Sequence, residues 1–394
     1  MNKNFDIAIV GGGLVGLATA CALSQHGLNI ALVDANIHQH QQLFHNEIGI
    51  RASAINNASQ RYFAQIGIWD DLLASKRVQD FSEIGVWEKN GQAHLAAHAK
   101  DYGYANLGYI IENDVISHYL YQYALSRTNI TIYPDQAINS EFSQDYACLT
   151  LSNETVLYAK LVIGADGAHS WIRKQENISV FERNYIHHAV ITTVETRYSH
   201  QSCARQIFYP NGIVAFLPLW QQNKSCLVWS TKPDNAAMLS SMSESDFCNE
   251  LFHLTGDKVG QCQLINPRMV FPLKARLARQ FIKHRLVLIG DAAHTIHPLA
   301  GQGVNLGFQD SALLVTTIKK LIDQQKDFGL VDNLKLFQFM RRKDTLVMLT
   351  AMRTIQDMFN GDSLVKKLIR TVGMNTIDHC SPIKKQLIKY AMHI

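Results

Sequence analysis

The sequence predicts an α/β fold in which a mainly parallel sheet, covered by helices, is interrupted by an antiparallel β-sheet domain and followed by C-terminal helices. Three observations support this prediction. An apolar run at residues 5–10 leads into a glycine-rich turn and then a helical pattern. Two further apolar runs, at 161–166 and 286–291, also end in an acid beside a glycine. Between them, residues 185–272 form strand-like segments with aromatic residues and prolines at their ends.

Length and composition set the size of the core and narrow the possible partners. With 394 residues and 47% hydrophobic content, the chain is expected to form two domains, because single cores stop growing near about 250–300 residues. The net charge of +4 is too small to indicate nucleic-acid binding. The seven cysteines are scattered without a C-x-x-C pair, which predicts a reduced, cytoplasmic protein without structural disulfides or a zinc site.

The apolar run at residues 7–23 imitates an export signal, because Ala-Thr-Ala at 18–20 resembles a signal-peptidase site. Four glycines between residues 11 and 16, however, stand in a fixed pattern that a secretory signal would not normally carry. The run also falls short of the ~20 apolar residues that a membrane span needs. We therefore expect neither export nor a membrane span.

Residues 5–34 carry a complete β–α–β dinucleotide-binding fingerprint, which predicts a Rossmann-like domain. Gly11 makes the tight turn after the first strand, Gly13 lets a pyrophosphate approach the helix N-terminus, and Gly16 lets helix and strand pack closely. Asp34 ends the second strand, where it can accept hydrogen bonds from ribose hydroxyls and disfavours a 2′-phosphate. The fingerprint therefore predicts FAD or NAD rather than NADP, and a glycine-rich turn without a ligand is disfavoured.

A second acid at the end of a strand stands near residue 290. The strand stops at Gly290 and Asp291, and a turn containing Gly301 and Gly303 then opens a helix that begins near residue 304. The carboxylate can accept bonds from sugar-type hydroxyls, and the N–H groups at the helix start can hold negative charge. This stretch suits the binding of a polyol chain and an electron-rich ring.

Two further positions allow more than one interpretation. Asp166 and Gly167 follow a buried strand, so they are either a second nucleotide contact or an ordinary turn between a strand and a helix. Arg51 stands just before residues 54–66, which follow helical spacing. Spacing alone favours a solvated charge at a helix start over contact with a phosphate or a flavin.

The remaining pattern predicts the other elements and the domain boundaries. We expect a strand pair at 81–98, a helix at 107–127, strands at 130–133, 147–151, 156–159 and 161–166, and a helix at 243–254. The predicted nucleotide-binding domain is discontinuous, at 1–75, 100–180 and 273–340; residues 76–99 and 181–272 form a β-rich substrate domain, and 341–394 a helical segment.

Histidines near these strands could suggest a metal site. His187 and His188 are adjacent in a predicted strand, so their side chains point to opposite faces. Asp291, His294 and His297 would need a helix running through a glycine-delimited turn to share one metal ion. We therefore expect no metal and interpret these histidines as core or supporting residues.

Three motifs in this order resemble the FAD-dependent aromatic hydroxylases that use a single nucleotide-binding domain. They are IVGGGLVGLATACAL at the start, GADGAHSWIR in the middle and GDAAHTIHPLAGQGVNLG near residue 300. RASAINNASQRYFAQIGIW, LGYIIEND, AFLPLW and the terminal KKQLIKYAMHI make the chain most similar to the ubiquinone-biosynthesis hydroxylases within that class. The resemblance covers nearly the whole chain and implies a para-hydroxybenzoate-hydroxylase-like fold.

The resemblance also implies roles for individual residues. Gly11, Gly13, Gly16 and Asp34 would bind the AMP half of FAD, and Arg51 would contact the flavin. Asp166 and Gly167 would handle both FAD and NAD(P)H, Gly290 and Asp291 would bind the ribityl chain, and Pro298, Gly301, Gly303 and Asn305 would line the isoalloxazine. One departure is that relatives often have glutamate where this chain has Asp34; the shorter side chain still reaches a ribose.

The implied activity is an FAD- and NAD(P)H-dependent monooxygenase that uses O2 to hydroxylate the aromatic ring of a polyprenyl phenol or benzoquinol in ubiquinone biosynthesis, including the demethoxyubiquinol step. The cofactor supplies the redox chemistry, so we name no catalytic acid or base. With one dinucleotide fingerprint, the nicotinamide would bind transiently. The alternatives are a hydroxylase of another aromatic substrate, a flavin dehydrogenase or oxidase that inserts no oxygen, and a non-enzymatic flavin-binding scaffold.

The last 31 residues have a charge pattern of their own. Residues 364–394 contain six basic side chains against one acid, and two amphipathic helical patterns place the basic residues opposite an apolar stripe. The basic residues are Lys366, Lys367, Arg370, Lys384, Lys385 and Lys389. We expect peripheral contact with anionic lipid at the inner face of the membrane, the alternative being two helices that pack on the body of the protein. Other ubiquinone-biosynthesis proteins are expected partners.

Overall fold

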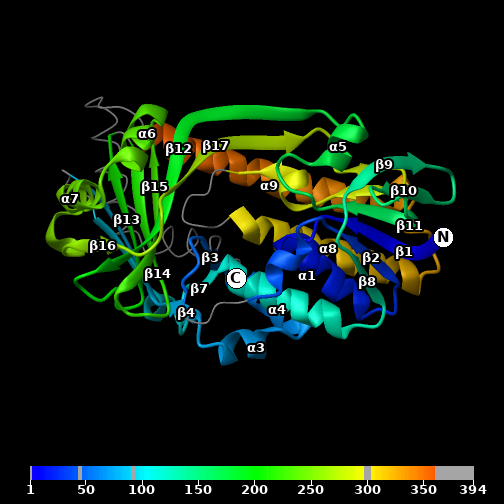
Figure 1. Ribbon diagram of the computed structural model, residues 1–394, viewed down its shortest axis with the longest axis horizontal. Coiled ribbons are helices and arrows are strands. Elements are labelled where there is room, and N and C mark those ends of the chain that lie inside the picture. Colours follow the sequence, from blue (N-terminus) through cyan, green and yellow to red (C-terminus); the bar gives the residue numbers. More distant parts are fainter. Residues whose placement is uncertain (1, 43–46, 90–93, 211, 297–302, 360–394) are drawn as a thin grey trace.

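The computed structural model describes residues 2–42, 47–89, 94–210, 212–296 and 303–359. Figure 1 shows two halves side by side, a parallel sheet with helices on the right and an antiparallel sheet on the left. The predicted fold class is confirmed, both in its α/β character and in the interruption by an antiparallel sheet. No helix of the described ranges is both long enough and apolar enough to cross a membrane.

The first sheet has eight strands and contains the predicted fingerprint. Its strands are β1 (Asn2–Val10), β2 (Ile30–Val33), β8 (Ile130–Tyr133), β9 (Ala137–Phe142), β10 (Ala147–Leu151), β11 (Val156–Gly164), β18 (Ile282–Lys283) and β19 (Leu286–Leu288). The main path runs β18-β19-β11-β1-β2-β8, and the pairs β19–β11, β11–β1, β1–β2 and β2–β8 are all parallel. Residues 7–10 are buried on both faces, which explains their unbroken apolar run.

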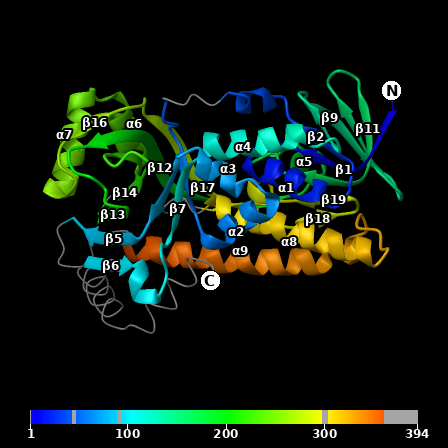
Figure 2. The same cartoon turned by 90° about the horizontal axis from the view of Figure 1, so that it is seen from below.

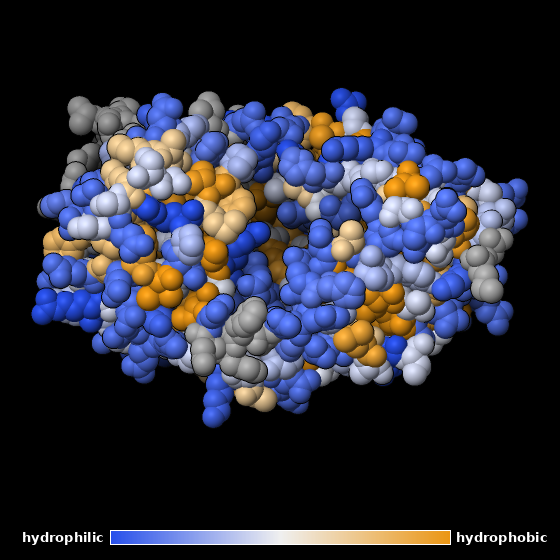
Figure 3. Space-filling model, in the orientation of Figure 1, coloured by the Kyte–Doolittle hydropathy of each residue, from blue (hydrophilic) through white to orange (hydrophobic). Residues whose placement is uncertain are grey.

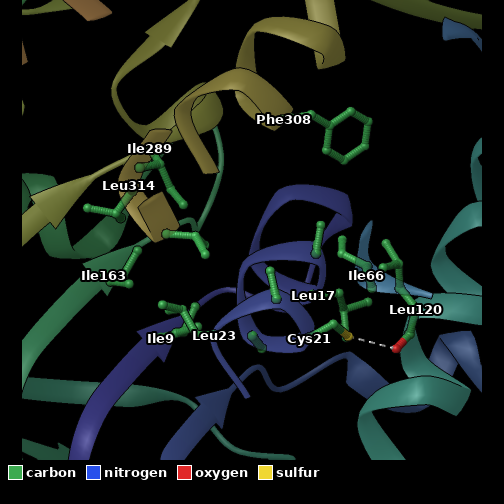
Figure 4. Close-up of a cluster of buried hydrophobic side chains, with 14 of the residues drawn as sticks. Ile9, Leu17, Cys21, Leu23, Ile66, Leu120, Ile163, Ile289, Phe308 and Leu314 are labelled. Carbon is green, nitrogen blue, oxygen red and sulfur yellow. Dashed lines mark hydrogen bonds between the residues drawn. The ribbon is translucent and has the colours of Figure 1, made fainter. Parts of the chain in front are cut away.

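Helices cover this sheet and form the largest core cluster. They are α1 (Leu14–Ser24), α2 (Asn57–Ile66), α3 (Trp69–Ala74), α4 (Asn113–Ser126), α5 (Trp171–Gln175), α8 (Gly303–Asp323) and α9 (Val331–Phe359). Figure 4 shows α1 at the centre, with Leu17 and Leu23 among side chains from the strands and from α2, α4 and α8. Because α1 is buried from Gly16 to Ser24, it is apolar all round rather than on one stripe.

The second sheet has nine strands and is mainly antiparallel. Its strands are β5 (Glu83–Glu88), β6 (His94–His98), β12 (Val180–Thr196), β13 (Cys203–Tyr209), β14 (Gly212–Pro218), β15 (Lys224–Thr231), β16 (Cys262–Leu264), β17 (Met269–Ala278) and β20 (His294–Thr295). Two helices, α6 (Pro233–Ser241) and α7 (Glu244–Thr255), bury Leu239, Phe247 and Leu251 against one face. The strand pair predicted at 81–98 is confirmed as β5 and β6.

A small third sheet joins the two halves. It consists of β3 (Ala52–Ile55), β7 (Gly108–Glu112) and β4 (Val78–Phe81). Phe81 and Ile110 share an apolar cluster with Leu217 and Cys226 of the nine-stranded sheet. Four short 3-10 turns complete the described elements: η1 (Ile37–His40), η2 (Ala99–Tyr102), η3 (Gly256–Lys258) and η4 (Gly290–Ala292).

Several predicted elements were wrong in type or extent. The segment at 107–127 is not one helix, because residues 108–112 pair with β3 and β4 as β7 before α4 begins at Asn113. Ala54 likewise belongs to β3 rather than to a helix. Short apolar runs carry the same signal in a buried strand and in a buried helix, so only the partners decide. The separate strands predicted at 156–159 and 161–166 are one strand, β11, and β9 and α6 were missed.

Two predicted domain boundaries fall inside continuous elements. The boundary at 273 lies within β17, and the boundary at 341 lies within α9, which runs unbroken from Val331 to Phe359. The strands β12 and β17 pair along most of their length and reach from one half toward the other, as Figure 1 shows. The C-terminal helical patterns predicted at 364–394 lie outside the described residues.

Candidate active site at the carboxyl ends of the parallel strands

The turns that the sequence singled out follow four neighbouring parallel strands. Because β2, β1, β11 and β19 run in the same direction, their carboxyl ends meet at one edge of the sheet. Backbone hydrogen bonds tie successive turns together: the N–H of Gly11 donates to Val33 (2.8 Å), that of Ala165 to Val10 (2.8 Å), and that of Ile289 to Gly164 (3.0 Å). Ligands of α/β sheets bind at this edge.

The three glycines of the first turn meet different surroundings. Gly11 has φ +107°, and a Cβ there would overlap the backbone of Ala165. A Cβ on Gly16 would overlap the carbonyl oxygen of Gly11. Gly13, the N-cap of α1, has no atom within 4 Å of where its Cβ would stand, and no side chain caps the helix. Open space therefore lies in front of the free N–H groups of α1, which suits a phosphate.

Asp34 holds the glycine turn from the end of β2. Its Oδ2 accepts a hydrogen bond from the N–H of Gly12 (2.6 Å), and its Oδ1 accepts one from Asn36 (2.7 Å). A carboxylate can accept about four bonds, so acceptor capacity remains for a ribose. His40, which sequence reasoning missed, donates from Nε2 to the carbonyl of Gly12 (3.1 Å), and burial lowers its pKa.

Asp166 combines the two interpretations that the sequence left open. Its Oδ2 accepts hydrogen bonds from the backbone of Trp171 (2.6 Å) and Ile172 (3.1 Å) at the start of α5, which is the role of a turn residue. Its Oδ1 is buried without a hydrogen-bond partner in the structure, and burial raises the pKa of the carboxyl. The unpartnered oxygen is available to a ligand. Gly167 follows with φ +80°.

Asp291 stands at the start of the turn after β19, beside Gly290 with φ +58°. Its side chain is exposed, yet the protein around it raises the pKa of the carboxyl through desolvation, against the lowering effect of His294, Arg51 and Arg276. Exposure with desolvation is expected of a group on the wall of a recess. Figure 3 shows the surface hollowed near the middle of this face, between the two sheets.

Arg51 comes to the same place from the other half of the molecule. It is exposed, and its guanidinium lies over the ring of Phe271 in β17, 5.5 Å from the ring centre. Its positive charge also lowers the pKa of Asp291, so the two side chains face a common region although 240 positions separate them. The residues after Arg51 form β3 rather than a helix, so the helix-start interpretation of this charge was wrong.

A buried charge network supports the Asp291 turn from below. Asp310 of α8 is fully buried, and its Oδ2 accepts hydrogen bonds from the N–H of Gly290 (2.8 Å) and from Nε2 of His294 (2.7 Å). Its Oδ1 accepts from Nε of Arg341 in α9 (2.5 Å). Burial would raise the pKa of Asp310, but His294 and Arg341 hold it below its ordinary value. An acid inside the apolar stripe of the predicted helix was the available sequence signal.

His294 is thus a core residue bonded to Asp310, and His187 is buried with its pKa lowered by desolvation. Within the described ranges, no three histidine, cysteine, aspartate or glutamate side chains are grouped so that they could hold a metal ion.

Asn305 is placed differently from the predicted flavin contact. Its Oδ1 accepts hydrogen bonds from the N–H of Asn56 (3.1 Å) and the hydroxyl of Ser59 (2.7 Å), and its Nδ2 donates to the carbonyl of Ala54 (2.7 Å). The side chain therefore ties the start of α8 to β3 and α2. Its backbone, next to Gly303 at the first turn of α8, is the part left for a ligand. Pro298 and Gly301 lie outside the described residues.

Comparison with known proteins identifies the class. The family model described as "FAD binding domain" matches residues 4–334, and the chain belongs to this family. The glycine turn with open space at the start of α1, the acid after β2 and the unpartnered oxygen of Asp166 fit that cofactor. The protein is an FAD-dependent monooxygenase.

The curated relatives narrow the family. The chain is 32% identical to 3-demethoxyubiquinol 3-hydroxylase of Escherichia coli over 99% of each chain. It is 32% identical to ubiquinone hydroxylase UbiL of Rhodospirillum rubrum, covering 99% of this chain and 90% of that protein. Human ubiquinone biosynthesis monooxygenase COQ6 is 31% identical, with 98% and 92% covered. The predicted resemblance to the ubiquinone-biosynthesis hydroxylases is confirmed.

Solved structures bear on the fold alone. The p-nitrophenol 4-monooxygenase PnpA of Pseudomonas putida superposes with a TM-score of 0.78 at 18% identity, covering 98% of this chain and 97% of that one. PqsL of Pseudomonas aeruginosa, a probable FAD-dependent monooxygenase, gives 0.77 at 18% identity, with 95% and 100% covered. Both halves of the molecule therefore occur together in such proteins.

Proposed function

We propose that this protein hydroxylates the aromatic ring of a polyprenyl phenol or benzoquinol intermediate of ubiquinone biosynthesis, with NAD(P)H and O2 as co-substrates. The observation that carries the proposal is the similarity to 3-demethoxyubiquinol 3-hydroxylase along 99% of both chains. The similarity includes the nine-stranded sheet as well as the nucleotide-binding strands. The demethoxyubiquinol step is therefore the first reaction to test.

The cofactor-binding roles follow from the site geometry. Gly11, Gly13, Gly16 and Asp34 hold the AMP half of FAD, since the start of α1 offers free N–H groups and open space. Asp166 and Gly167 contribute to FAD and NAD(P)H handling, and Gly290 and Asp291 bind the ribityl chain. Gly303 and the backbone of Asn305 lie at the flavin, as do Pro298 and Gly301 by the sequence motif. When bound, FAD supplies the redox and oxygen chemistry.

The chain's own side chains prepare the place where the ring reacts. Arg51 and the positive end of α8 favour negative charge near the flavin's pyrimidine edge. The apolar cluster between the small sheet and the nine-stranded sheet starts one residue after Arg51, at Ala52. Such a wall excludes water and receives a flat, apolar ring.

The test uses an Escherichia coli strain that lacks 3-demethoxyubiquinol 3-hydroxylase. Expression of this chain should restore ubiquinone and remove the accumulated demethoxy intermediate, as measured by mass spectrometry of extracted quinones. Growth under ¹⁸O2 should place one heavy oxygen in the product ring. Restoration without ¹⁸O would indicate a dehydrogenase or oxidase role, and accumulation of a different intermediate would assign another ring position or another aromatic substrate.

Association with the membrane and with other ubiquinone-biosynthesis proteins belongs to the same proposal. A polyprenyl tail dissolves in a bilayer, so the enzyme must meet its substrate at or near a lipid surface. The six basic residues between Lys366 and Lys389 supply an attraction to anionic headgroups. This attraction would hold the protein at the inner face of the membrane without a spanning helix.

A further inference from the structure

The outer face of α9 carries apolar side chains that the fold does not use. Leu336, Phe339, Met340, Leu346 and Val347 are 65%, 68%, 42%, 47% and 45% exposed. Spacings of three, four and seven residues place them on one side of the helix, and we call them the outer stripe. No other described helix has more than one exposed large apolar side chain. Figure 2 shows α9 as the outermost helix, with α8 between it and α1.

The opposite face of α9 is the one that the fold requires. Leu334 and Phe337 are buried in the main core, and Arg341 bonds to Asp310 of α8. Further along, Met348 packs with Ile296 and Leu306, at the end of the Asp291 turn and at the start of α8. A helix with side chains is about 10–12 Å across, so the outer stripe lies about one helix diameter from the wall of the site.

The charges within and beside the outer stripe have a net positive character. Asp332 pairs with Lys335 (2.6 Å), and Asp344 pairs with Arg341 (2.8 Å), so both acids are neutralised within the helix. Lys343 lies between Met340 and Val347 on the exposed face and has no acidic partner among the described residues. An apolar strip with a free cation complements a surface that offers hydrocarbon below phosphate.

We propose that the outer stripe docks on a lipid bilayer surface that contains anionic headgroups. The inference rests on the proposed function, because a polyprenyl substrate resides in such a bilayer. Phe339, Leu336 and Val347 would enter the interface while Lys343 extends to the phosphates, as long basic side chains do at membrane surfaces. A second copy of the chain fits less well. A two-fold contact centred on the stripe would bury two unpaired lysines in an apolar patch, which is costly.

The experiment measures co-sedimentation of the full-length FAD-loaded protein with phosphatidylcholine vesicles, with and without phosphatidylglycerol. The variant Leu336→Gln/Phe339→Gln/Val347→Gln should bind about tenfold more weakly than wild type to both kinds of vesicle. Lys343→Gln should lower binding only to the vesicles with phosphatidylglycerol. The matched control Leu73→Gln/Leu125→Gln changes two side chains that are 47% and 53% exposed on other helices, and it should bind like wild type.

Two outcomes would overturn the docking surface. One is equal binding by wild type and by the stripe variant. The other is a concentration-dependent dimer in light scattering that the stripe variant alone abolishes, with no vesicle binding by either; this would assign the face to a second copy.

Activity separates this inference from the proposed function. The stripe variant should turn over a water-soluble short-chain quinol at the wild-type rate and lose activity only on polyprenyl quinol embedded in vesicles. If wild type turns over neither substrate while stripe-dependent vesicle binding persists, the proposed reaction fails and the docking surface stands. If both proteins use the embedded substrate equally, the docking surface has no role in delivery and the inference fails.

Discussion

The three glycines of the turn after β1 differ in what a side chain would meet, and this difference makes a sharp test possible. Gly13→Val should leave folding intact, because nothing lies within 4 Å of the new Cβ and φ is −73°. The same side chain would occupy the space in front of the N–H groups of α1. We expect the purified variant to be folded and colourless, whereas wild type carries non-covalent FAD and is yellow. Circular dichroism and the flavin absorbance measure the two properties.

Gly16→Val is the matched control for this substitution. Its Cβ would overlap the carbonyl oxygen of Gly11, so this variant should lose soluble protein rather than cofactor alone. If Gly13→Val retained a full complement of FAD, the pyrophosphate would not lie at the start of α1.

Asp291 gives a prediction about affinity and its pH dependence. Replacing it by alanine removes a charge-assisted hydrogen bond worth about 1.5–3 kcal/mol, so the dissociation constant for FAD should rise about 10- to 150-fold without unfolding. Desolvation raises the pKa of Asp291, so the carboxylate takes up a proton at a higher pH than an ordinary aspartate. FAD binding should therefore weaken as the pH falls toward that raised pKa.

The measurement is a titration of the apoprotein with FAD at several pH values. Asp291→Asn keeps the shape of the side chain and should bind FAD weakly with a flatter pH dependence. An unchanged dissociation constant in both variants would reduce Asp291 to a structural turn residue.

At the scale of elements, the charge network of Asp310 holds two helices against the Asp291 turn. Asp310→Asn leaves Arg341 and His294 without their buried anion, so unfolding should become easier by about 3–5 kcal/mol. Asp344→Asn removes the half-exposed partner of the same arginine and should cost no more than about 1 kcal/mol. Urea unfolding of the apoproteins compares the two. Similar small effects from both would show that the network is not a main support.

The same network has a defined pH response. The pKa of Asp310 is held below its ordinary value, so its contribution to stability is complete above about pH 3.9, the usual aspartate pKa. It is lost as the pH falls through the lowered pKa of the folded state, when the carboxyl takes up a proton. Acid unfolding of wild type should therefore extend to lower pH than that of Asp310→Asn.

The elements that sequence predicted correctly are those whose signal is local. The first strand, α1 and β2 follow from a turn motif and apolar runs within residues 5–34, and α8 follows from the helical pattern after Gly303. The strand at 108–112 could not be distinguished from a helix, since its partners β3 and β4 stand dozens of residues away. The Asp310–Arg341 pair likewise depends on how α8 packs on α9.

At the scale of the whole molecule, the site is assembled from distant parts of the chain, and its membership could be predicted only through the motifs. Geometry then changed the meaning of some members. Asn305 uses its side chain to join α8 to β3 and α2, a bond network that no spacing reveals. Arg51 reaches Phe271 in β17, across the boundary between the two halves. Such contacts follow from the docking of sheets, which leaves no periodic signal in a sequence.

The distribution of charge along the chain leads to a prediction for the intact protein. Changing Lys366, Lys367, Arg370, Lys384, Lys385 and Lys389 to glutamine should remove the salt-sensitive part of vesicle binding, at about 1 kcal/mol per residue near an anionic surface. Co-sedimentation at low and high salt measures it, because salt screens charges but not apolar contacts. Equal, salt-independent binding of this variant and wild type would leave these residues a packing role only.

The order of the strands in the first sheet also has a consequence for biosynthesis. The end of β11 lies between β1 and β19, but β19 is made only after the ribosome has added the whole antiparallel sheet from β12 to β17. At about 5–20 residues per second, the roughly 120 residues between Gly164 and Leu286 take about 6–24 seconds. During that interval the nascent chain presents an apolar strand edge, which is a template for aggregation. The newly made enzyme therefore depends on chaperones until α8 has emerged, and the flavin can be fully enclosed only after that point.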